Sequence, residues 1–69
     1  MKPQKTRDVI KHLRSLGWVY LRDAQGSHEL WGLPDGSVKA SIPAGHREVS
    51  AGVLKQIKDA GADLPESWR

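Results

Sequence analysis

The chain of 69 residues is short enough to be one domain, and it carries 11 Lys and Arg residues against 8 Asp and Glu, for a formal net charge of +3. A domain this small buries only about 60% of the surface that its unfolded chain exposes, which excludes a large substrate cavity. The sequence has no cysteine, which excludes disulfides and thiolate metal sites. The excess of positive charge favours polyanionic partners such as nucleic acids.

The sequence contains nothing typical of a membrane span or an export signal. Its apolar runs are only a few residues long, and its N-terminal stretch, "MKPQKTRDV", is polar. We therefore expect a cytoplasmic protein that makes no contact with a membrane.

A first helix is predicted over residues 7–16. Thr6 is placed to cap its start through the side-chain hydroxyl, and Gly17 is placed to end it. One face of this helix is apolar, since four apolar residues recur at helical spacing: Val9, Ile10, Leu13 and Leu16.

Three strands are predicted next. The turn sequences "DAQGS" and "GLPDG" separate them, and Pro34 and Gly36 suit the second turn. The third strand alternates cleanly, which predicts one buried and one wet face. In the first strand either set of alternate residues could face the core. The three strands span residues 18–22, 28–31 and 37–42.

A second amphipathic helix is predicted after Ser50, which suits a cap, and it ends at Gly61. The order helix, three strands, helix predicts an α+β fold, in which two helices pack on one face of a three-stranded antiparallel sheet. We expect one domain over residues 1–61. Residues 62–69 would then be an irregular tail, which Trp68 could dock onto the domain.

His28 is the first candidate for chemistry. A histidine can accept and return a proton near neutral pH. The small residues Gly26 and Ser27 just before it allow a polyanion backbone to approach and leave backbone N–H groups as donors. The alternative interpretation is a plain hairpin turn followed by a half-exposed strand residue.

The other two histidines are less distinctive. His12 is predicted to lie on the surface of the first helix, and His46 could meet His28 only if the fold brings its loop to the second strand. No pair of histidines has metal-ligand spacing, so we expect no metal site and no cofactor.

The basic residues form a second candidate feature. On the first helix they fall at positions i, i+4 and i+7, which makes one stripe, and two more lie on the predicted strands. Such a set recognises a phosphate backbone without reading bases, although a solvated surface is the alternative. The candidate RNA-binding residues are Arg7, Lys11, Arg14, Arg22 and Lys39.

The stretches "VIKHLRSLGWVYLRDAQGSHELW" and "SIPAGHREVSAGVLKQIKDAG" together resemble the HicA-type toxins of toxin–antitoxin pairs. The shared features are a helix ending in Gly-aromatic, an arginine, Gly-Ser-His before an aromatic, an apolar-Pro step, a basic loop with His, and a last helix ending in Ala-Gly. The resemblance covers residues 7–61. The tail "ADLPESWR" and the short turn "LPDG" depart from the pattern of the family.

The resemblance implies a double-stranded-RNA-binding-domain-like fold, α-β-β-β-α. It also implies a type II toxin that is an endoribonuclease (an mRNA interferase), with mRNA as substrate and a HicB-type antitoxin as partner. The catalytic histidine of the family corresponds to His28, and its small neighbours correspond to Gly26 and Ser27.

The expected chemistry needs no metal, because RNA supplies its own 2′-hydroxyl as nucleophile. His28 would transfer protons, while Arg22 and Lys39 would stabilise the phosphate. His46 is a candidate for a second acid or base. The alternative function is a non-catalytic module that binds double-stranded RNA by its shape or docks a protein.

Overall fold

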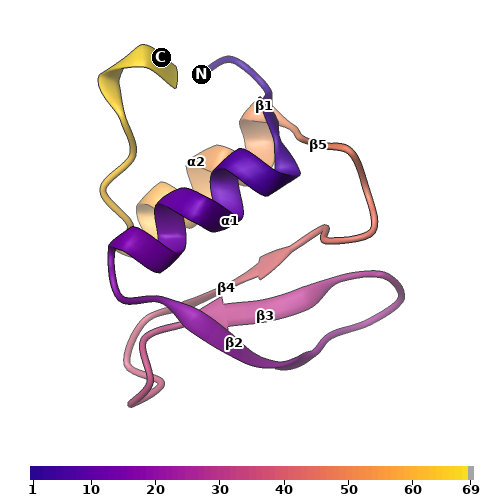
Figure 1. Cartoon of the computed structure of the whole chain (residues 1–69), viewed down its shortest axis with the longest axis vertical. Helices are drawn as coiled ribbons and strands as arrows, with labels where there is room; N and C mark the ends of the chain where they lie inside the picture. The colour runs from indigo at the N-terminus through magenta and orange to yellow at the C-terminus, as the bar shows by residue number, and fades with distance from the viewer. Residues whose placement is uncertain (69) are drawn as a thin grey trace.

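The computed structural model, which describes residues 1–68, has two layers: two helices lie over one face of an antiparallel sheet (Figure 1). The predicted order of helix, three strands and helix is confirmed, with boundaries close to the predicted ones. In chain order the elements are α1 (Thr6–Ser15), β2 (Val19–Asp23), β3 (Glu29–Gly32), β4 (Lys39–Ile42) and α2 (Ala51–Asp59).

Three short elements were not predicted. β1 (Gln4–Lys5) pairs antiparallel with β5 (Glu48–Val49), and a 3-10 helix spans Glu66–Trp68. The β1–β5 pair holds the start of α1 beside the segment that follows β4 (Figure 1). Strands of two residues carry no measurable periodicity, so the pattern of the sequence gives no signal for them.

β3 is the central strand of the sheet, between β2 and β4. Trp31 on β3 lies opposite Tyr20 on one side and Ala40 on the other, and only 4% of the surface of Trp31 is exposed. This row therefore faces the helices. The neighbouring Leu30 lies opposite Ser41. Because side chains alternate across a strand, that second row lies on the open face of the sheet.

The core lies between the helices and the inner face of the sheet. Trp18 and Trp31 are buried in it. In the first predicted strand neither set of alternate residues is wholly buried, since Trp18 is buried but Tyr20 is 47% exposed and Val19 is 40% exposed. On β4 the predicted pattern is confirmed, since Ile42 is buried and Lys39 is exposed. The whole is an α+β fold with the α-β-β-β-α layout of a double-stranded-RNA-binding domain.

The start of α1 differs from the prediction. Thr6 is the first helical residue, and the residue at the cap position is Lys5, whose side chain makes no capping hydrogen bond. The predicted cap at Thr6 is wrong because its hydroxyl has another partner: it donates to the backbone carbonyl of His46 over 2.6 Å. A contact between residues so far apart in the chain leaves no local signal in the sequence.

The tail docks on α1, as predicted for Trp68. The ring of Trp68 meets His12 edge to face with centroids 5.3 Å apart, and its carbonyl accepts a hydrogen bond from the amide of Lys2 over 2.7 Å. His12 Nε2 lies 2.6 Å from the carbonyl oxygen of Asp63, so this histidine is half-buried rather than on the surface as predicted. Leu64 is buried in the core. The last residue of the predicted tail lies outside the described residues, and the domain boundary stays a prediction.

Candidate active site

His28 lies at the end of the tight turn between β2 and β3. The amide of Ala24 donates to the carbonyl of His28 over 2.9 Å, and the amide of His28 donates to the carbonyl of Gln25 over 3.3 Å. Gly26 has a φ of 65°, a conformation that favours glycine. Gly26 and Ser27 are exposed and His28 is half-buried, so a ligand can reach all three predicted site residues.

The segment after β4 meets this turn at the same edge of the molecule (Figure 1). The amide of Gly45 donates to the carbonyl of Ser27 over 3.1 Å. A Cβ added at Gly45 would lie only 2.5 Å from the Cβ of Ser27, so the two loops approach closely because residue 45 is glycine. The hydroxyl of Thr6 holds the next carbonyl, that of His46, from the other side.

The fold thus brings His46 to His28, which is the condition under which His46 could take part in the site. The two ring centroids are 6.1 Å apart and the ring planes are inclined at 55°. The two imidazoles are therefore neighbours at one edge of the molecule, near enough for both to contact one bound group.

The open face of the sheet begins at His28. A shallow hollow of about 340 Å³ there is lined by His28, Ser41 and the turn before β3. Arg22 lies near the end of β2 that adjoins this turn. Lys39 instead lies opposite Gly32, at the far end of the sheet. Three residues of β4 separate it from the histidine end, roughly 10 Å.

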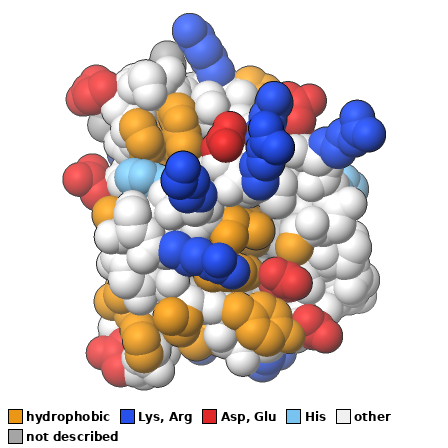
Figure 2. Space-filling model, in the orientation of Figure 1, with side chains coloured by type: hydrophobic (Ala, Val, Ile, Leu, Met, Phe, Trp, Pro, Cys, Tyr) orange, Lys and Arg blue, Asp and Glu red, His pale blue; other side chains and the backbone are white. Residues whose placement is uncertain are grey.

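The predicted basic stripe on α1 is present, and its members Arg7, Lys11 and Arg14 are all exposed. Figure 2 shows Lys and Arg side chains gathered over α1. Only Arg7 lies at the end of α1 that is close to His46. Arg14 is about 10 Å further along the axis, where its guanidinium lies 5.4 Å from the centre of the Trp31 ring.

Two groups away from the histidines have perturbed acidities. The hydroxyl of Tyr20 donates to the carboxylate of Asp23 over 2.7 Å, and loss of this bond on ionisation raises the pKa of Tyr20 above its ordinary value. In the β3–β4 turn, hydrogen bonds from the side chain and backbone of Ser37 lower the pKa of the Asp35 carboxyl.

Sequence reasoning missed two residues that shape the site. The alternation of the third strand predicts that Ser41 lies on a solvent-exposed face but gives it no role in the site. Gly45 falls in a stretch for which the sequence predicts only a loop. The one local signal for Gly45 is its place directly before His46, in "AGH". Its need for a glycine comes from contact with Ser27, which lies far away in the chain.

Within residues 1–68, no helix is long and apolar enough to cross a membrane. The same part of the chain holds no group of three or more His, Asp or Glu side chains that could share a metal ion.

Comparison with known protein families supplies the class of the protein. The model of a family described as the HicA toxin of bacterial toxin–antitoxin pairs matches residues 6–62. The protein is thus a toxin of a toxin–antitoxin system, whose partner is an antitoxin. The chain belongs to the HicA toxin family, which confirms the resemblance noted in its sequence. A search of curated proteins found no match.

Proposed function

We propose that this toxin is an endoribonuclease that cleaves mRNA, with His28 transferring protons at the scissile phosphate. The observation that carries the proposal is the pairing of His28 with His46, with ring centroids 6.1 Å apart at an exposed edge. Membership of a toxin family supports it, because RNA cleavage is a direct way to arrest growth. The site of action would be the cytoplasm, where mRNA is translated.

The chemistry follows from the RNA itself. One histidine would take the proton from the 2′-hydroxyl, which attacks the adjacent phosphorus, and the P–O bond to the 5′-oxygen breaks. The other would donate a proton to that leaving oxygen. The products are a 2′,3′-cyclic phosphate and a free 5′-hydroxyl. This route needs neither a metal nor a nucleophile from the protein.

Exposed cations would hold the RNA through its phosphates. Arg22 is exposed and lies at the histidine end of the sheet, so it would contact the reacting phosphate, together with Gly26 and Ser27 of the turn. Lys39 lies too far along β4 for that role, and we assign it to a more distant phosphate. Lys11 and Arg14 would do the same along α1.

The antitoxin would be a HicB-type protein that covers this edge and excludes RNA. Its docking would remove the partly exposed His28 from solvent. We propose the extent of the toxin domain as residues 1–61, with the remaining tail docked on it.

Cleavage of a labelled RNA by the purified protein tests the proposal. His28→Ala should lower the rate by about 10²- to 10⁴-fold while the circular dichroism spectrum and RNA affinity stay near those of wild type. His12→Gln is the matched control, because His12 lies on α1 beneath the tail. Cleavage by His28→Ala at the wild-type rate would contradict the role of this histidine.

The end groups of the products give an independent reading of the mechanism. A 2′,3′-cyclic phosphate and a 5′-hydroxyl are expected, and an RNA with 2′-deoxyribose at the cleaved position should remain intact. Absence of cleavage by the wild-type protein would contradict the proposal. It would favour the alternative function, a non-catalytic module that binds double-stranded RNA or a protein.

A further inference from the structure

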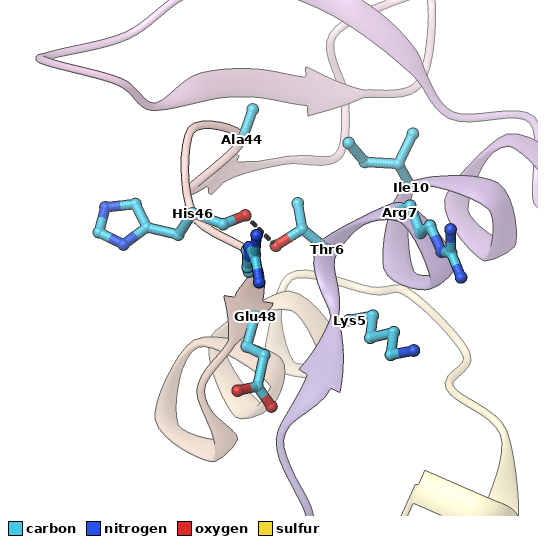
Figure 3. A pocket seen from close by; sticks show the side chains of 8 residues that line it. Lys5, Thr6, Arg7, Ile10, Ala44, His46 and Glu48 are labelled. Atoms are coloured by element: carbon cyan, nitrogen blue, oxygen red, sulfur yellow. Dashed lines mark hydrogen bonds between the residues drawn. The ribbon is translucent and has the colours of Figure 1, made fainter.

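A hollow of about 750 Å³ lies between the start of α1 and the β4–β5 segment (Figure 3). Three of its lining residues are cations, Lys5, Arg7 and Arg47, and one is an acid, Glu48. All four are exposed, and together they give the hollow a net charge of +2. It is therefore accessible and suited to an anion.

Backbone contacts fix the frame of this hollow. The amide of Thr6 donates to the carbonyl of Arg47 over 2.8 Å, and Lys5 on β1 lies opposite Glu48 on β5. Lys5 and Arg47 thus belong to paired backbone, and Arg7 lies in the first turn of α1. Ile10 and Ala44 add an apolar portion to the wall, which phosphate alone would not use.

The backbone of His46 separates the hollow from the histidine pair. Its carbonyl faces Thr6 at the edge of the hollow, while its imidazole points away from the hollow (Figure 3). That imidazole is the ring that lies 6.1 Å from His28. The two sites are consequently adjacent along one edge, on opposite sides of a single residue.

We propose that this hollow is a second subsite for single-stranded RNA, which holds a phosphate next to the one between the histidines. The inference rests on the proposed ribonuclease function and adds where the strand runs from the reacting phosphate. Arg7 and Arg47 bind the phosphate oxygens, since a guanidinium donates two parallel hydrogen bonds to such a group. Ile10 and Ala44 contact the attached sugar or base, so the subsite favours no particular sequence.

Binding of a fully 2′-O-methylated oligonucleotide tests the subsite, because this RNA has no free 2′-hydroxyl and stays uncut. The double variant Arg7→Ala, Arg47→Ala should bind about tenfold more weakly than wild type. Its slope of log affinity against log salt should be shallower by about 0.7 for each phosphate that the variant no longer neutralises. Lys55→Ala, Lys58→Ala is the matched control, since it removes the same charge from exposed positions on α2.

Glu48, the acid in the lining of the hollow, allows a test in which RNA affinity should rise rather than fall. Glu48→Gln should tighten binding of the same oligonucleotide about two- to threefold, because it removes the one negative charge that faces the phosphate. Asp59→Asn, an exposed acid at the end of α2, is the control and should change affinity less.

The outcomes separate this inference from the proposed function. Equal weakening by both double variants would overturn the subsite in favour of general attraction by net charge. Unchanged affinity in Arg7→Ala, Arg47→Ala would also overturn it. These cations would then not bind RNA, and contact with a protein partner would be their alternative role. If binding depends on the hollow but wild type leaves ordinary RNA intact, the subsite stands and the ribonuclease function fails.

Discussion

The two ends of the sheet carry different kinds of side chains. At one end, close to the start of α1, His28 and His46 lie on loops joined by a backbone hydrogen bond, with exposed cations beside them. At the other end Trp31 is buried, and the guanidinium of Arg14 on α1 lies over its ring. The first end holds accessible proton-transfer groups, whereas the second contributes apolar burial to stability. Loss of an exposed side chain at the first end should therefore change mainly function, whereas loss of a buried side chain at the second end should change mainly stability.

The largest expected effect on stability is at the second end. Trp31→Ala should lower the free energy of unfolding by about 3–5 kcal/mol, because it removes a buried aromatic side chain and leaves a cavity. Denaturant unfolding followed by circular dichroism measures this. A decrease below about 1 kcal/mol would contradict the division between the two ends.

At the histidine end, His46→Gln should change activity and leave stability alone. If His46 is the second acid or base, the rate of RNA cleavage should fall about 10²-fold, and one limb of the bell-shaped dependence of the rate on pH should disappear. The His46 side chain is exposed, so the unfolding midpoint should stay at that of wild type. A pH profile that keeps both limbs would remove His46 from the mechanism.

Gly45→Val tests whether the two loops must touch. Its side chain would clash with Ser27. If the two loops keep their positions, the free energy of unfolding should fall by about 1–3 kcal/mol. If the loops move apart, His28 and His46 separate, and the rate of cleavage falls while RNA binding persists. Gly52→Ala, on α2, is the control, because a Cβ there meets nothing closer than 4.0 Å. Unchanged stability and cleavage in Gly45→Val would show that this approach is unimportant.

The smallest effect is expected from Arg14→Gln. It removes the cation over Trp31, which contributes about 0.5–1 kcal/mol at an exposed site. Its effect on RNA cleavage should be smaller than that of Arg7→Gln, since Arg7 lies beside the histidine end. Unfolding midpoints and cleavage rates of the two variants, measured in parallel, make the comparison. An equal decrease of cleavage in both variants would contradict the difference between the two ends and would mean that the basic stripe on α1 supports cleavage equally along its length.

Local patterns in the sequence were enough to predict the helices, the three main strands and the buried face of β4. Periodicity works there because each element has a covered and a wet side. The same approach failed for Thr6 and His12, whose partners, His46 and Asp63, are distant in the chain. The candidate site is intermediate: the turn before His28 has a local signature, but its contact with His46 depends on how the two loops pack.

The most direct test of the central claim is induction of wild type and of His28→Ala, separately, in a bacterium that lacks the antitoxin. Growth and intact mRNA would be followed, with the soluble amount of each protein measured as a control. The account predicts growth arrest with loss of mRNA for wild type only. Arrest with loss of mRNA in both strains would contradict the catalytic role of His28, and arrest with intact mRNA in both would mean that the toxin acts by binding.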